Sequence, residues 1–269
     1  MNLYQRERLR KYILLSMFLV VLLFVPILAS YTIYQFLGNR KYSGEDYRLK
    51  KIIAKTSSTY ELPLDHLEGF LGLEDKVYYG EFNGTELSEK LRSSPVVASA
   101  EVRIVKPDII FIKYSCFEPL AYVLDIDNSA IDSTGTIFPV YPYYTPKKIP
   151  ELFLGISDIL EWKDKLNGAK IDLALYILSF LSQEDDYSDV DILALDVSGL
   201  SSSLAAERQI ILKLLVYDKI NILRLDANNY LKGLGHYLSI RSHLTKLNYS
   251  NITIDLRFDE MAFVMGRYE

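Results

Sequence analysis

Hydrophobic and polar residues alternate near the C-terminal end of the sequence. The apolar positions are Ile252, Ile254, Leu256 and Phe258, and polar residues lie between them. A period of two is typical of a β-strand with one buried face. A strand near a chain terminus frays unless it is paired. Two interpretations are therefore open: the strand simply completes a sheet, or it also presents an edge to which a partner can add.

Helical and extended patterns alternate through the first region, 47–118. Pro63 and Gly72 have the positions of a helix start and a helix stop around leucines spaced three and four apart. Thr85 is expected to be the N-cap of a second helix, and Pro95 follows the end of that helix. The predicted order is a strand in 48–58, a helix in 61–73, an extended piece in 76–82, a helix in 83–95, and strands in 98–106 and 109–117.

The second region, 119–269, is predicted to be a mixed domain. Asp132 and Gly135 favour a turn, which makes 131–138 a hairpin. Further on, the patterns predict helices in 169–183 and 228–248 and strands in 189–198 and 219–226, before the closing strand. The predicted fold class is therefore α+β, with a small module followed by a larger domain.

A long uncharged stretch precedes both regions. Between Lys11 and Arg40 there is no charged residue for 28 positions. A helix of about 25 residues spans roughly 37 Å, so the apolar part, 12–37, predicts a transmembrane helix. Four basic residues between Arg6 and Lys11 predict that the N-terminal tail lies in the cytoplasm and that the chain after the helix lies outside.

A cleaved signal peptide ending near Ala29 is the alternative for this stretch. The apolar run continues past that residue and is longer than an ordinary signal peptide core. The sequence therefore favours an uncleaved anchor, which implies a single-pass protein of the cytoplasmic membrane.

Charge is unevenly distributed along the chain. Residues 1–51 carry a formal charge of +6 and residues 52–269 a charge of −11, within a net charge of −5. An acidic domain lacks the basic footprint that nucleic-acid binding needs. The one cysteine, Cys116, lies in an apolar run, which excludes an intramolecular disulfide and predicts a buried, unreactive thiol.

Patterns of enzymatic or metal-binding residues are weak. The three histidines, His66, His236 and His243, do not form an HExxH motif, and surface positions explain them better than a metal pair. The acidic run 184–191 lacks the glycine at which a calcium loop turns. We therefore expect no catalytic residues, no metal site and no cofactor.

Two stretches of the sequence share motifs with a known family. The first, "LRSSPVVASAEVRIVKPDIIFIKYSCFEPLAYV", is followed by "IDSTGTIF", and the second begins "INILRLD" and closes with "ITIDLRF". In their order behind one apolar segment they resemble the FtsQ/DivIB family of bacterial cell-division proteins. The matching positions of the first stretch are Pro95, Val97, Ala100, Val102, Pro107, Glu118, Pro119, Ala121, Asp132, Gly135 and Phe138.

The resemblance implies an architecture and a function. The implied parts are a cytoplasmic tail (1–11), a transmembrane helix (12–37), a linker (38–46), a POTRA module of β-α-β-α-β-β type (47–118) and a β-domain with a C-terminal edge strand (119–269). The implied function is that of a non-enzymatic scaffold of the division machinery, which recruits other division proteins at the division site.

The resemblance also implies partners. Family members hold a coiled-coil complex of the FtsB and FtsL type through the C-terminal part of the β-domain, and the POTRA module is a second docking surface. By this resemblance the partner-binding residues are Arg257, Phe258 and Glu260. The alternatives are a POTRA-containing secretion or envelope-assembly factor, which would show repeated modules or membrane strands, and an anchored envelope hydrolase, which would need a catalytic constellation.

Overall fold

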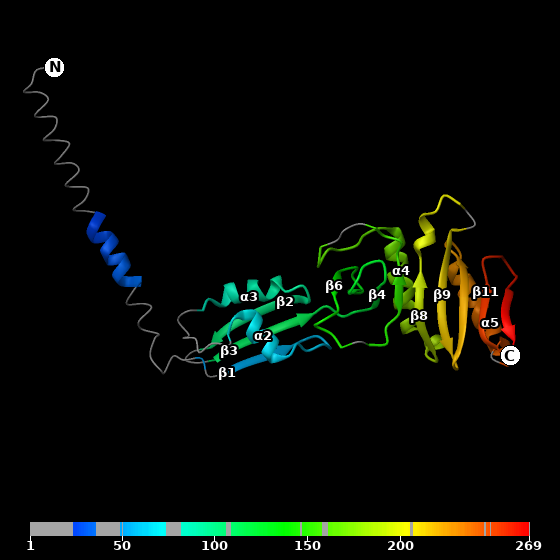
Figure 1. Ribbon diagram of the computed structural model, residues 1–269, viewed down its shortest axis with the longest axis horizontal. Helices are drawn as coiled ribbons and strands as arrows, with labels where there is room; N and C mark the ends of the chain where they lie inside the picture. Colours follow the sequence, from blue (N-terminus) through cyan, green and yellow to red (C-terminus); the bar gives the residue numbers. More distant parts are fainter. Residues whose placement is uncertain are drawn as a thin grey trace, which may run out of the picture. The chain divides into compact units, whose positions relative to one another are not determined.

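The computed structural model (Figure 1) describes a mixed α and β protein with one small and one large sheet. The described residues are 24–35, 49, 51–73, 82–105, 109–145, 147–157, 161–204, 207–244, 246–247 and 249–268. They divide into two compact units. Unit 1 contains the chain up to Lys55 together with Pro63–Leu91 and Ala100–Lys113, and unit 2 contains Thr56–Leu62, Arg92–Ser99 and Tyr114–Glu269.

The predicted transmembrane helix is not supported. In the described part of 12–37, residues 24–35 are helical. Within the described ranges, no helix has both the length and the apolar character needed to cross a membrane. The prediction of a transmembrane helix over 12–37, and with it the single-pass inner-membrane location, is therefore wrong. Positions 12–23, 36 and 37 lie outside the described residues.

Three strands form the small sheet in the order β1-β3-β2. The buried residues of β3 alternate along the strand, from Ile110 to Cys116, and the strand lies where the sequence predicted one. Two helices accompany these strands in the chain, so the described order is strand, helix, helix, strand, strand; the predicted extended piece 76–82 lies almost wholly outside the described residues. The bounds are β1 Lys51–Thr56, α2 Leu64–Leu71, α3 Gly84–Ser93, β2 Val97–Val105 and β3 Ile109–Cys116.

Local sequence signals explain the ends of both helices. Gly72 follows α2 with a φ of 76°, and its left-handed conformation lets the next amide, of Leu73, donate to the Glu68 carbonyl at 2.8 Å. At the start of α3 the side chain of Asn83 accepts a hydrogen bond from the Thr85 amide at 3.0 Å. Asn83, and not Thr85, is therefore the capping residue.

Nine strands form the large sheet in the order β12-β11-β10-β9-β8-β7-β4-β5-β6. The pairs β10/β11, β7/β8 and β4/β7 are parallel, and the remaining neighbours are antiparallel. The bounds are β4 Ala121–Val123, β5 Ser129–Ile131, β6 Ile137–Pro139, β7 Glu151–Phe153, β8 Val190–Asp196, β9 Gln209–Val216, β10 Lys219–Asp226, β11 Tyr249–Asp255 and β12 Phe263–Tyr268.

Both long helices of this unit cover the same face of the large sheet. Side chains of α4 (Ala169–Gln183) and α5 (Tyr230–Leu244) share one core cluster with alternate residues of β9 and β10. In β9 these inward residues, from Ile210 to Val216, are fully buried, while the residues between them are half-buried. One face of the sheet is therefore packed, and the other is open to solvent over much of its area.

A buried polar pair fixes α5 to the sheet. The side-chain amide of Asn221 on β10 donates a 2.7 Å hydrogen bond to the hydroxyl of Tyr237 on α5. Both residues are fully buried. A buried amide and hydroxyl are tolerated in a core because they satisfy one another.

Four strands of the large sheet were not predicted from the sequence, namely β4, β7, β9 and β12. The strand at 252–258 was predicted, but it ends at Asp255 as β11, and β12 pairs with its outer side. The interpretation of the 252–258 strand as the edge of the sheet is therefore wrong, because among the described residues the edge is β12.

Candidate partner-binding edge

Strand β12 is the outer strand at one end of the large sheet (Figure 1, red). It runs antiparallel to β11, with Phe263 opposite Asp255, Val264 opposite Ile254 and Met265 opposite Thr253. Opposed residues share a face of the sheet. Phe263 and Met265 therefore lie on the open face, and Val264 lies on the face that the helices cover.

Large apolar side chains are exposed along this edge. Phe258 is 48% exposed, Met261 55%, Phe263 50% and Met265 54%. The rings of Phe258 and Phe263 meet edge to face, with their centroids 5.4 Å apart. We call Phe258, Met261, Phe263, Val264 and Met265 the edge residues. Neighbouring exposed aromatic and methionine side chains are typical of protein-binding surfaces.

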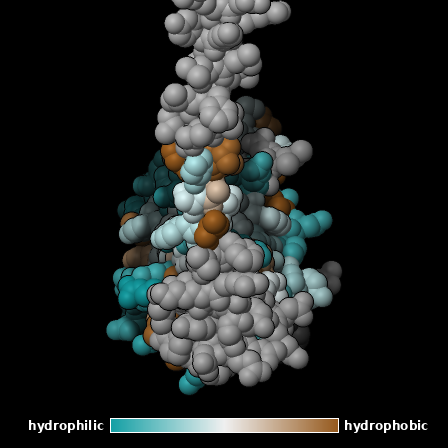
Figure 2. Space-filling model, turned by 90° about the vertical axis from the view of Figure 1, so that its left-hand side faces the viewer, coloured by the Kyte–Doolittle hydropathy of each residue, from teal (hydrophilic) through white to brown (hydrophobic). Residues whose placement is uncertain are grey.

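The N-terminal side of the molecule has a different surface. On the coloured part of the face in Figure 2, hydrophobic side chains form small separate patches among hydrophilic ones. Single apolar residues of this kind are normal on a protein surface. The edge residues differ because they follow one another along a strand and its preceding turn.

A glycine allows β12 to approach β11 closely. A Cβ atom on Gly266 would lie 2.6 Å from Cγ2 of Ile252 and 3.0 Å from the Asn251 carbonyl oxygen. The register of the two strands also shifts between Tyr249 and Ile252, which indicates a β-bulge. Tight packing at Gly266 therefore helps to hold the outer strand on the sheet.

An ion pair fixes the end of β11 beside this edge. Arg257 donates from Nε to Oδ1 of Asp255 at 2.9 Å and from Nη2 to Oδ2 at 2.7 Å, and Arg224 lies 3.4 Å from the same carboxylate. The hydrogen bonds from Arg257 are the main reason that the pKa of Asp255 is lowered, although its burial opposes this shift. Charged pairs with this two-point geometry are among the stronger hydrogen bonds.

The turn between the two strands is tied to α5. Lys232 donates to Oδ1 of Asp259 at 2.8 Å. This hydrogen bond raises the pKa of Lys232 and lowers that of Asp259, and both groups are exposed. Exposed pairs contribute little stability, so this contact orients the turn more than it stabilises the domain.

The three predicted partner-binding residues lie at the start of this turn but have different roles in the structure. Arg257 is half-buried and engaged with Asp255. Phe258 does not continue the buried face of β11, since Leu256 is buried and Phe258 is exposed. Glu260 is exposed and has a φ of 61°, a left-handed conformation that is uncommon for a residue other than glycine.

Sequence reasoning missed Met261, Phe263, Val264 and Met265. Their signal was present as the apolar run "MAFVM", which a reader can find just after the predicted strand. The alternation ends at Phe258, and without a predicted turn between 258 and 263 this run does not indicate a separate strand.

Two observations bear on reactive side chains among the described residues. Burial raises the pKa of the Cys116 thiol to about 11, so the group is a poor nucleophile at neutral pH. In the ranges that the structure covers, no group of three or more His, Cys, Asp or Glu residues is arranged to hold a metal ion.

Comparison with known proteins adds no relative. No protein-family model matches the chain, and no curated protein matches it. Assignment of the chain to a class of proteins therefore depends on its sequence motifs and on the geometry of the edge.

Proposed function

We propose that this protein is a non-enzymatic scaffold of the bacterial division machinery and that it binds a partner through the edge residues of β12. The single observation that supports this most is the exposure of Phe258, Phe263 and Met265 beside a strand edge that no other described strand pairs with. The resemblance of its motifs to those of the FtsQ/DivIB family supplies the biological context. The proposed partner is a coiled-coil complex of the FtsB and FtsL type.

The geometry of the edge supports two kinds of contact with one partner. The outer side of β12 offers main-chain N–H and C=O groups to which an extended segment can add. Phe263 and Met265 on the open face offer aromatic and thioether surface, which is enriched in binding hot spots and adaptable interfaces. Main-chain pairing would supply affinity, and the edge side chains would supply specificity.

The residues predicted from the resemblance take separate roles in this proposal. Phe258 contacts the partner together with Phe263, because the two rings form one surface. Arg257 is a positioning residue that holds the end of β11 through Asp255. Glu260 lies on the exposed turn and contributes charge at the rim of the interface.

Two lysine substitutions test the proposal. Phe258→Lys and Phe263→Lys should each weaken binding of a purified FtsB/FtsL-type coiled coil by about thirtyfold, on the scale of a hot-spot loss of about 2 kcal/mol. Both residues are half exposed, so the urea midpoint should move little. Calorimetric titration and urea unfolding of the full chain measure the two effects separately.

A matched control uses an exposed apolar residue far along the chain from this edge. Leu204 is 60% exposed, and Leu204→Lys should leave both affinity and stability unchanged. Partner binding at full strength by both phenylalanine variants would refute the edge as the docking surface. A fluorescent fusion that fails to concentrate at the division site of dividing bacteria would refute the role in division.

A further inference from the structure

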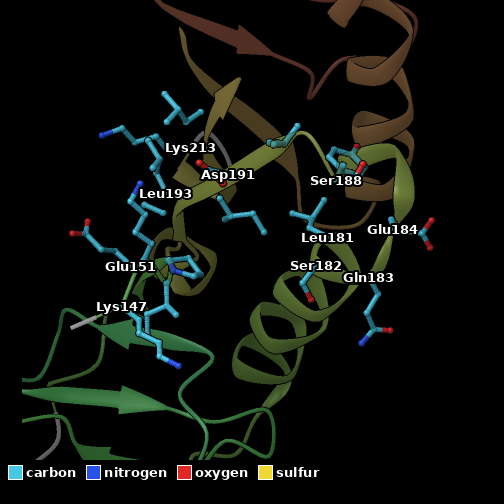
Figure 3. Close-up of a pocket in the computed structure, with 18 of the residues that line it drawn as sticks. Lys147, Glu151, Leu181, Ser182, Gln183, Glu184, Ser188, Asp191, Leu193 and Lys213 are labelled. Atoms are coloured by element: carbon cyan, nitrogen blue, oxygen red, sulfur yellow. The ribbon is translucent and has the colours of Figure 1, made fainter. Parts of the chain in front are cut away.

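A groove lies in the large sheet, beside β8 and away from β12. An open groove of about 750 Å³ runs between β8, the segment that leads into β7 and the C-terminal end of α4 (Figure 3). This volume is within the range of ligand-binding pockets. Its walls include Lys148, Glu151, Leu181, Glu184, Asp191 and Lys213.

The groove exists because β8 is paired along only part of its length on this side. Strand β7 pairs with Ala194–Asp196 alone, through Glu151–Phe153. Pro150 precedes β7 and has no N–H to donate, and its carbonyl accepts a hydrogen bond from Tyr122 on β4 at 2.9 Å. Among the described residues, the first half of β8 therefore has β9 on one side and no strand on the side of the groove.

Main-chain groups of Val190 and Ile192 point into this gap. The two-residue turn at Tyr217 and Asp218, both with positive φ, makes Val216 and Lys219 the closing hydrogen-bonded pair of the β9–β10 hairpin. Hydrogen-bonding direction alternates along an antiparallel ladder. Leu215 of β9 therefore bonds with Asp191, its opposite residue.

It follows that the residues on either side of Asp191 turn their N–H and C=O groups away from β9. Val190 and Ile192 thus present two donors and two acceptors to the groove at the spacing of a β-strand. An extended main chain satisfies such a row, whereas a compact small molecule matches it poorly.

Charges at the two ends of the groove differ in sign. In Figure 3, Glu184 and Ser188 lie toward the beginning of β8, whereas Lys147 and Lys213 lie at the opposite side. Glu184 and Asp185 follow the C-terminus of α4, whose helix dipole adds to the negative field. At the other end the three lysines Lys147, Lys148 and Lys213 outnumber the two carboxylates of Glu151 and Asp191.

The apolar part of the groove lies between these ends. Leu181 of α4 and Ile192 of β8 line it, and Leu181 is buried while Ile192 is only partly so. An added strand would place every second side chain toward this apolar wall and the others toward solvent. A β-branched residue at the inward positions fits that requirement.

We propose that this groove binds an extended peptide segment of a partner protein as a short added strand beside Val190–Leu193. The segment carries a basic residue at the end near Glu184 and Asp185, β-branched residues in the middle, and an acidic residue at the end near Lys148 and Lys213. This site is independent of the edge residues of β12, so a failure of either proposal leaves the other standing.

A synthetic probe tests the site on the full chain. The probe is the peptide Lys-Val-Thr-Val-Thr-Asp, capped at both ends and fluorescently labelled. Saturable binding below about 1 mM is expected by anisotropy, together with slower hydrogen exchange of the amides in Val190–Leu193. A version methylated on two successive central amide nitrogens loses a donor toward β8 and should bind at least tenfold more weakly.

Charge variants test the orientation of the ends. The double variant Glu184→Lys with Asp185→Lys should weaken probe binding about tenfold at low salt. The double variant Asp65→Lys with Glu89→Lys changes net charge equally in unit 1 and should bind the probe as the unaltered protein does. Equal binding of the methylated probe, unchanged exchange at Val190–Leu193, or no saturable binding would each overturn the proposal.

Discussion

The two edge strands of the nine-stranded sheet, β6 and β12, differ in whether the described chain covers them. At one end β6 is three residues long and wholly buried, and at the other end β12 is six residues long and carries exposed aromatic and methionine side chains. Every sheet edge has unpaired main-chain groups that invite another strand. The described chain covers the edge at β6, whereas no other described strand pairs with the edge at β12.

The covered end shows how an edge is closed. Ile137 donates to the Asp164 carbonyl at 3.0 Å and accepts from the Lys163 amide at 2.8 Å, so a loop takes the outward hydrogen bonds of β6. Pro139 ends the strand and has no N–H to offer. The ring of Phe138 stacks on Phe117 with centroids 5.3 Å apart. The outward main-chain groups of Ile137 are therefore already paired within the chain.

The uncovered end lacks each of these features in its described part. No described strand lies outside β12, and the strand contains no proline. Its apolar side chains lie where closed edges carry lysine or proline. An edge left open in a chain that closes its other edge indicates a binding surface, and this contrast is the physical basis of the proposed function.

The largest expected effect tests the contrast directly. Phe138→Ala removes a fully buried ring and should lower the free energy of unfolding by about 4 kcal/mol. Phe263→Ala removes a half-exposed ring with one edge-to-face contact and should cost about 1 kcal/mol. Urea unfolding of both variants gives the comparison, and equal losses would show that β12 is part of the core.

Much of the fold follows from sequence patterns. The alternation in β11, the glycine after α2 and the turn at Asp132 all predicted elements that the structure contains. In the turn, the Gly135 amide donates to the Asp132 carbonyl at 3.1 Å. These signals are local, because each depends on residues within a few positions of one another.

The strands that the sequence did not predict lack a local signal. β9 reads "QIILKLLV", in which apolar residues occupy both faces and hide the period of two. β4 and β7 are three residues each, too short to show any period. Both partners of β7, β4 and β8, are distant from it in sequence, so only tertiary pairing defines that strand.

The sequence predicted the turn residues of the candidate site but not strand β12, which carries most of its exposed apolar side chains. Phe258 and Glu260 were predicted from the motif that ends β11, and both are exposed in the turn that follows it. Phe263 and Met265 were missed because a strand is an edge strand when no other strand pairs with one of its sides, and no sequence pattern shows this. The pairing of Arg257 with Asp255 was hidden for a similar reason, since alternation placed both on one polar face without indicating contact.

A second expected effect concerns the ion pair that holds the open end. The folded protein lowers the pKa of Asp255, so folding favours the ionised carboxylate. The resulting stability is present above about pH 4, the ordinary value for the unfolded chain, and is lost as the pH falls toward the lowered value. Asp255→Asn should cost about 2 kcal/mol at pH 7.

The pH dependence separates this carboxylate from the others. At pH 3 the difference between Asp255→Asn and the unaltered protein should shrink, because the unfolded chain, in which the pKa of Asp255 is higher, then binds a proton that the folded protein does not. Urea midpoints at pH 7 and pH 3 measure it. A difference that stays constant across this range would show that the Arg257 contact does not depend on the charge of Asp255.

A smaller effect sharpens the description of how β12 is attached. Gly266→Ala places a methyl group 2.6 Å from Ile252 Cγ2, so the strands must move apart at a cost of roughly 1–2 kcal/mol. Gly235→Ala on α5 meets open space and should stabilise by up to about 1 kcal/mol. Hydrogen exchange should accelerate in β12 of the Gly266 variant alone; unchanged protection there would contradict the close packing of β11 and β12.

The smallest expected effect separates binding from folding at the open end. Glu260 is exposed and has a left-handed φ of 61°. Alanine and glutamate both have a Cβ atom, so the backbone strain at this φ is the same for both. Glu260→Ala should therefore change the free energy of unfolding by less than about 0.5 kcal/mol. If the turn contacts the coiled-coil partner, loss of this rim charge should weaken binding about threefold and should do so mainly at low salt. Titrations at two salt concentrations measure this. A threefold loss that persists at high salt would show that Glu260 acts through the shape of the turn and not through its charge. In that case Glu260→Gly should bind the partner more weakly than Glu260→Ala does. Glycine tolerates the same φ, but it frees the turn that presents Phe258.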